Sequence, residues 1–66
     1  MKTRIVYEDR DILICHKPAG LATQSASVLE PDVVSELKKH LDGGYLGIVH
    51  RLDQPVEGLL VFARSK

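Results

Sequence analysis

Three polar residues within four positions, His50, Arg51 and Asp53, carry the side chains best suited to chemistry in this 66-residue chain. They supply an imidazole, a guanidinium and a carboxylate, and an apolar run begins shortly after them at Gly58. Because an opposite charge nearby favours an ionised carboxylate, Asp53 beside Arg51 could act as a nucleophile or a base. In an extended segment Arg51 and Asp53 would share one side, while Leu52 would point to the other side and could anchor the loop.

The same three residues also have simpler structural explanations. An Asp before Gln54-Pro55 commonly forms a turn by bonding to its own backbone, and a nearby Arg is usually a solvated surface charge. His50 follows two apolar residues, which is typical of a buried histidine that bonds to a backbone carbonyl. Spacing alone favours these structural roles over catalytic ones.

Composition says little about the partner of this chain. Nine basic and nine acidic residues cancel, so the net charge gives no indication of nucleic-acid binding. If the chain binds a polyanion, the positive groups must be local, and the candidates near the cluster are Lys17, Arg51, Arg64 and Lys66.

The single cysteine and the N-terminal sequence are typical of a protein in the reducing cytoplasm. Cys15 alone can form neither an intrachain disulfide nor a cysteine-rich zinc site, and it fits a small buried residue in a reducing environment. The N-terminus lacks the apolar stretch of a signal peptide, and no run approaches membrane-spanning length. We therefore expect a soluble, cytoplasmic protein with no membrane partner.

The elements that must position the cluster form an α+β fold with a mixed, mainly antiparallel sheet. Two runs rich in β-branched residues predict a hairpin over residues 4–16, followed by a type I turn over 17–20. Pro31 and the apolar spacing after it predict one helix near 31–42, which Gly43-Gly44 would end. Further strands are predicted near 45–50 and 58–63.

The last predicted strand, near 58–63, indicates that the fold is incomplete. Its run from Leu59 to Phe62 is wholly apolar, which predicts burial on both faces, and one hairpin and one helix cannot cover both. We therefore expect residues 1–66 to be a single partial domain. An incomplete sheet edge would also allow a homo-oligomer to form.

Three motifs together resemble one family. His50-Arg51-Leu52-Asp53, with Gly-Leu-Leu-Val-Phe-Ala from Gly58, resembles the signature of RluA-type RNA pseudouridine synthases. Upstream, Ile5-Val6-Tyr7-Glu8-Asp9 and Lys17-Pro18-Ala19-Gly20-Leu21 are similar to the opening segment of that family. The first motif alone is a weak match, but the combination is specific and covers most of the chain.

The resemblance implies a function and a role for each site residue. Such enzymes isomerise uridine in RNA to pseudouridine without a metal or an organic cofactor, and Asp53 matches their essential aspartate. It also implies that Arg51 fills the space of the flipped base or holds the adjacent backbone. His50 would brace the loop at the RNA-binding surface. The expected partner is ribosomal or transfer RNA.

Two departures from the family pattern limit what carries over. Val56-Glu57 stands where the family usually has Thr-Ser, so two hydroxyls are missing and a negative charge lies where RNA phosphate would approach. The later strands, with a tyrosine that stacks on the uracil and a basic residue that pairs with the aspartate, have no counterpart here. We therefore expect little or no turnover from this chain alone. The alternative is a non-catalytic RNA-binding or interaction module derived from the family.

Overall fold

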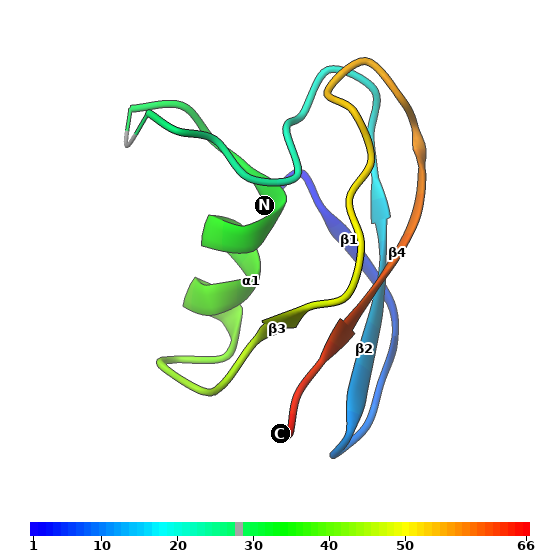
Figure 1. Ribbon diagram of the computed structural model, residues 1–66, viewed down its shortest axis with the longest axis vertical. Helices are drawn as coiled ribbons and strands as arrows, with labels where there is room; N and C mark the ends of the chain where they lie inside the picture. Colours follow the sequence, from blue (N-terminus) through cyan, green and yellow to red (C-terminus); the bar gives the residue numbers. More distant parts are fainter. Residues whose placement is uncertain (28) are drawn as a thin grey trace.

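The computed structural model describes residues 1–27 and 29–66, in which one helix packs on a four-stranded sheet (Figure 1). The elements are β1 (Arg4–Glu8), β2 (Ile12–Lys17), α1 (Val33–His40), β3 (Gly47–Ile48) and β4 (Gly58–Ala63). The sheet order is β1-β2-β4-β3, and every neighbouring pair is antiparallel. The predicted α+β architecture is therefore confirmed, although the strand expected near 45–50 is only two residues long.

A tight turn closes the predicted hairpin between β1 and β2. The Asp9 carboxylate accepts hydrogen bonds from the backbone N–H groups of Ile12 and Asp11, at 2.9 and 2.8 Å. The Ile12 bond, together with bonds from the Tyr7 hydroxyl and from Asp11, lowers the pKa of Asp9. An aspartate that bonds to its own backbone in this way is typical of a turn.

The helix begins two residues later than predicted. Asp32 precedes α1 in an extended conformation, with φ −150°, and its carboxylate caps the helix by accepting from the Ser35 N–H at 2.6 Å. The helix ends at His40, and positive φ angles follow at Asp42 and Gly43, as a glycine stop requires. In the described part of the chain no helix is long and apolar enough to cross a membrane.

The core lies between α1 and one face of the sheet. Burial raises the pKa of the Cys15 thiol to about 11, so this residue is a buried thiol, as predicted, and not a reactive thiolate. The buried apolar side chains come from β2, β4, α1 and the loop before the helix: Leu13, Cys15, Leu21, Val33, Val34, Leu37, Leu60 and Phe62.

The last strand is covered on one face only, as the shortage of covering layers predicts. Burial alternates along β4, because Leu60 and Phe62 are fully buried against the α1 side whereas Leu59 is 56% exposed. Only one sheet face is covered by α1 in the described residues (Figure 1). An all-apolar run therefore marked one buried face and one open apolar face.

Two adjacent leucines in β4 test this assignment. We expect Leu60→Ala to lower the free energy of unfolding by about 2–5 kcal/mol, because it leaves a cavity in the core. Leu59→Ala should change it by less than about 0.5 kcal/mol, as is usual for a solvent-facing side chain. Urea unfolding followed by circular dichroism measures both values. Equal losses at the two positions would mean that the open face is covered in solution.

Candidate functional site

Asp53 lies at the head of a turn in the segment that joins β3 to β4. Its side chain is exposed, and its backbone carbonyl accepts a hydrogen bond from the Val56 N–H at 2.9 Å. Within residues 1–27 and 29–66, no hydrogen bond and no ion pair to its carboxylate is found. The structural role predicted from spacing is therefore filled by the main chain, and the exposed Asp53 side chain has no part in it among the described residues.

Leu52 anchors this segment, as the alternation of residues 51–53 predicts. It is half-buried against the core, and the Thr23 hydroxyl bonds to its main chain twice, donating to the carbonyl at 2.8 Å and accepting from the N–H at 3.2 Å. Gly58 leaves the space that Leu52 needs, because a Cβ there would lie 3.1 Å from Leu52 Cδ1. Thr23 thus fixes the main chain of the residue immediately before Asp53, and a side chain at position 58 would crowd Leu52.

Lys17 fixes the residues that follow Asp53. This lysine is fully buried at the end of β2, and its ammonium donates to the carbonyls of Pro18 at 3.0 Å, Gln54 at 2.8 Å and Val56. All three ammonium donors are therefore used, which offsets the cost of burying the charge. The sequence predicts Lys17 as a positive group near the cluster that could meet a polyanion. It does lie beside the cluster, but its buried ammonium is engaged with main-chain carbonyls and is not available to a polyanion.

The turn after β2 provides a second contact to the Asp53 segment. The Gly20 N–H donates to the Gln54 carbonyl at 2.9 Å, and the Gln54 side-chain amide donates to the Gly20 carbonyl at 3.0 Å. Gly20 has φ +92°, and the Leu21 N–H bonds to the Pro18 carbonyl. The turn thus spans residues 18–21 with glycine at its third position, as in a type II turn, and the type I turn predicted over 17–20 is wrong.

The loop that carries Thr23 is itself held by the start of α1. The N–H groups of Val33 and Val34 donate to the carbonyls of Ala22 and Thr23, at 2.9 and 3.0 Å. These N–H groups have no partner inside the helix, so the loop satisfies them. The helix, the loop and the Asp53 segment therefore form one connected hydrogen-bonded unit.

Arg51 is not paired with Asp53, contrary to expectation. Its guanidinium Nη2 donates to the Gln24 side-chain carbonyl at 2.9 Å, and in the described residues no ion pair within 4.0 Å joins it to the aspartate. Arg51 and Asp53 are nevertheless both exposed, whereas Leu52 points inward. Arg51 therefore lies two residues from the Asp53 carboxylate without forming an ion pair with it.

His50 is exposed, so the prediction that it is a buried histidine is wrong. Its Nε2 accepts a hydrogen bond from the Val61 N–H of β4 at 3.1 Å. This bond follows directly after the short ladder in which Ile48 lies opposite Phe62. The ring therefore extends the pairing of β4 beyond the end of β3. Contact between His50 and RNA stays a prediction.

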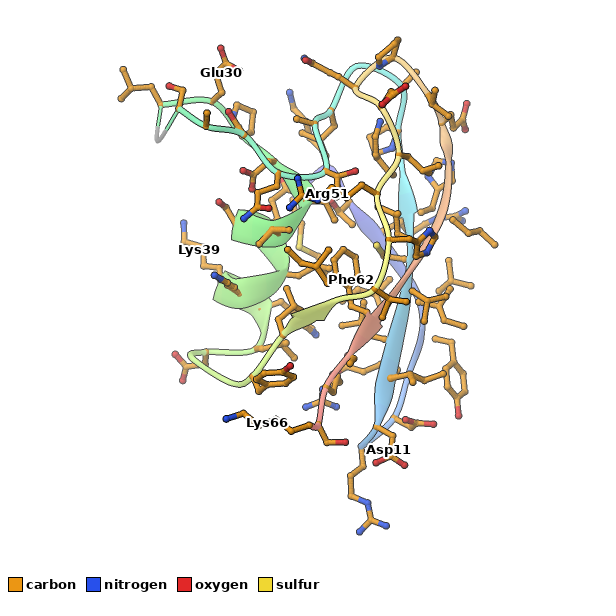
Figure 2. The ribbon with its side chains drawn as sticks, in the orientation of Figure 1. Asp11, Glu30, Lys39, Arg51, Phe62 and Lys66 are labelled. Carbon is orange, nitrogen blue, oxygen red and sulfur yellow. The ribbon has the colours of Figure 1, made fainter. Side chains whose placement is uncertain are left out.

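The other two predicted cations lie away from the cluster. Arg64 donates to the Asp9 carbonyl at 2.6 Å and pairs with Glu8 at 3.0 Å, beside the hairpin turn. The Lys66 ammonium lies 5.7 Å from the centre of the Tyr45 ring. Figure 2 shows Lys66 and Arg51 toward opposite ends of the molecule. Of the four candidates, only Arg51 remains beside Asp53 with an exposed side chain.

Glu57, the unusual residue after the turn, has a partner on β2. Its carboxylate lies 2.8 Å from His16 Nε2. His16 and Lys17 are adjacent in a strand, so their side chains leave opposite faces of the sheet. The Asp53 turn is therefore tied to β2 from both faces, and the Glu57 carboxylate is engaged with His16.

An open hollow of about 640 Å³ lies beside this turn. It is bordered by Lys2, the 18–21 turn, Glu30, Pro31 and the Gln54 side chain. The size is that of a small-molecule pocket. Among the described residues, no group of three or more His, Cys, Asp or Glu side chains is arranged to hold a metal ion.

Sequence reasoning missed the positioning residues of the site. Thr23 and Gln24 lie in a loop without periodicity, and their partners are 29 and 27 positions away. No local pattern could reveal such pairs. A buried Lys17 was equally unexpected, because lysine is almost never fully buried unless it is paired.

Comparison with known proteins gives one consistent family. The family model described as RNA pseudouridylate synthase matches residues 11–66. Ribosomal large subunit pseudouridine synthase C of Rickettsia bellii is 44% identical over 62 residues, which cover 92% of this chain and 21% of the relative. Ribosomal large subunit pseudouridine synthase D of Buchnera aphidicola is 43% identical over 67 residues, with the same coverage.

A solved structure agrees with this result. Human RNA pseudouridylate synthase domain containing 4 matches with a TM-score of 0.69 and 28% identity, over 96% of this chain and 25% of the human chain. The chain thus spans about a fifth of the length of the curated relatives it matches.

The role of Lys17 can be tested by removing its charge. We expect Lys17→Met to lower the free energy of unfolding by at least about 2 kcal/mol, because it removes three charge-assisted hydrogen bonds and leaves the Val56 carbonyl without a donor among the described residues. Urea unfolding measures this loss, and amide hydrogen exchange at Gly20 and Val56 should become faster. Lys39→Met, at an exposed helix position, is the control and should change stability by less than about 0.5 kcal/mol. A similar small change for Lys17→Met would contradict the assignment.

The Thr23 contact can be tested with two nearly isosteric changes. Thr23→Val removes the hydroxyl and should cost about 1–3 kcal/mol, because it leaves the N–H and the carbonyl of Leu52 unsatisfied. Thr23→Ser retains the hydroxyl and should cost clearly less. Urea unfolding and exchange at the Leu52 N–H measure the difference. Equal effects would show that the methyl group matters and the hydroxyl does not.

Proposed function

The chain belongs to the RNA pseudouridylate synthase family, and we propose that it supplies the catalytic aspartate of an enzyme that isomerises uridine to pseudouridine in RNA. The observation that carries the proposal is the Asp53 carboxylate, which is exposed and has no partner in the described part of the chain, on a main chain held by Thr23 and Lys17. A reacting group needs this combination, because it must reach the substrate while its position stays fixed.

The proposed reaction moves the base from nitrogen to carbon. The bond between ribose C1′ and uracil N1 breaks, and a bond between C1′ and uracil C5 forms. The C5 hydrogen leaves as a proton and N1 gains a proton, so the atoms balance without an oxidant or reductant. Asp53 attacks the sugar, attacks the base or removes a sugar proton, and each route needs an ionised carboxylate at the glycosidic bond.

The proposed substrate is ribosomal RNA, since the two bacterial relatives are named as ribosomal large subunit synthases. Transfer RNA is the alternative substrate class. The target base must leave its stack to reach Asp53, and we assign Arg51 and His50 to contacts with the RNA around it. The hollow beside Gln54 offers room for a neighbouring nucleotide. Such a substrate would place the protein in the cytoplasm.

The length of the chain bears on its activity. We propose that residues 1–66 are the N-terminal part of a catalytic domain, and that the chain alone turns over little or no RNA. Coverage of about a fifth of the relatives supports this view. The same observation favours a second candidate, a non-catalytic RNA-binding or interaction module. The open β4 face and the sheet edges would also permit a homo-oligomer.

The enzyme proposal can be tested in a chimera in which this chain replaces the matching segment of the Rickettsia bellii relative. We expect the chimera to release tritium from RNA labelled at uridine C5, and Asp53→Asn to slow this release by about 10²–10⁴-fold or more. Because the Asp53 carboxylate has no structural partner among the described residues, the same variant should change the stability of the chain by less than about 0.5 kcal/mol.

Asp42→Asn is the matched control, since Asp42 is exposed and follows α1. It should leave turnover unchanged. Unchanged turnover of the Asp53→Asn chimera would overturn the assignment of Asp53. RNA binding without isomerisation in the unmutated chimera, unaffected by Asp53→Asn, would favour the non-catalytic module. Robust turnover by the 66-residue chain alone would contradict the proposal that it is incomplete.

A further inference from the structure

Gln24 is the side chain that holds Arg51, and the proposed function gives it no role. Two adjacent loop residues face two adjacent residues of the site: Thr23 bonds to the Leu52 main chain, and Gln24 bonds to the Arg51 side chain. The carbonyls of Ala22 and Thr23 are in turn held by the first N–H groups of α1. Gln24 therefore contacts Arg51 from a loop whose preceding residue, Thr23, is bonded to the Leu52 main chain.

The Gln24 amide can orient the Arg51 guanidinium without changing its charge. A guanidinium has five N–H donors, and the Gln24 amide oxygen takes one of them, on Nη2, at 2.9 Å. Among the described residues the other four donors have no partner, which is enough for a bidentate contact to a phosphate. Because an amide is neutral, Gln24 limits the movement of a long, flexible side chain and leaves its positive charge intact.

We propose that Gln24 is a positioning residue that aims the Arg51 guanidinium at an RNA phosphate next to the target uridine. This inference rests on the proposed function, and it specifies how the one exposed predicted cation beside Asp53 is directed. A glutamate at this position would accept the same hydrogen bond but cancel the charge. A methionine would have a similar length but no acceptor.

In the chimera we expect the two substitutions to affect different quantities: Gln24→Met should change kcat, and Gln24→Glu should change the salt dependence of RNA affinity. Gln24→Met should lower kcat by about three- to tenfold, the range of one exposed hydrogen bond, and leave the salt dependence of RNA affinity unchanged. Gln24→Glu should keep Arg51 in place but reduce the slope of log affinity against log salt by about one, because one phosphate contact is neutralised. The probe is a hairpin RNA with uridines in its loop.

A double-mutant cycle with Arg51→Met tests whether Gln24 acts through Arg51. If it does, Gln24→Met will have no further effect on kcat in the Arg51→Met background. A loss of the same size in both backgrounds would overturn the proposal and indicate a structural effect of the loop. The proposal would also be overturned if Gln24→Met did not lower kcat in the chimera that keeps Arg51.

A measurement on the chain itself distinguishes failure of this inference from failure of the proposed function. The ¹⁵N heteronuclear NOE of the Arg51 Nε–Hε group should fall in Gln24→Met and stay high in Gln24→Glu. If the unmutated chimera makes no pseudouridine, the proposed enzyme function fails, and the NOE still decides whether Gln24 orients Arg51. An NOE that is equally low in the unmutated chain and in both variants would overturn the inference on its own.

Discussion

The site depends on one buried charge. The Lys17 ammonium lies in the protein interior, where an unpaired cation would be costly, and within residues 1–27 and 29–66 its partners are the carbonyls of Pro18, Gln54 and Val56. Two of these carbonyls are 37 and 39 positions further along the chain. Satisfying the ammonium therefore requires the 18–21 turn and the Asp53 turn to lie together, and that requirement acts on the main chain, independently of the side chain at position 53.

A second side chain of β2 also holds the segment that follows Asp53. Since neighbouring strand residues face opposite sides, Lys17 holds the Asp53 turn from the helix-covered side, and His16 holds Glu57 from the open side. His16 and Lys17, which are consecutive in β2, therefore bond to the β3–β4 loop from opposite faces of the sheet. The Val56-Glu57 departure from the usual family pattern is consistent with this geometry, because the carboxylate has a strand partner and the Val56 contribution is its carbonyl.

The sequence predicted those features that local pattern determines. The hairpin, the helix and β4 follow from propensity and spacing, and the exposure of Asp53 and Arg51 around an inward Leu52 follows from alternation. The bonding partners could not be predicted in this way. Arg51 is expected to pair with Asp53 two residues away, yet it bonds to Gln24, and Lys17 is expected to be available to a polyanion, yet it is buried. Gln24 is remote from Arg51 in sequence, and so are the Gln54 and Val56 carbonyls from Lys17, so only the fold brings these groups together.

The same reasoning explains why spacing alone could not separate a turn aspartate from a catalytic one. Turn formation at residues 53–56 uses the Asp53 carbonyl, and the neighbouring anchors are Leu52, Gln54 and Val56, all held through main-chain atoms. The fold therefore makes no demand on the Asp53 side chain among the described contacts. Asp42 is equally exposed, so the lack of a structural role alone does not mark a catalytic carboxylate. What distinguishes Asp53 is a main chain fixed on both sides of it, in a chain that matches the RNA pseudouridylate synthase family.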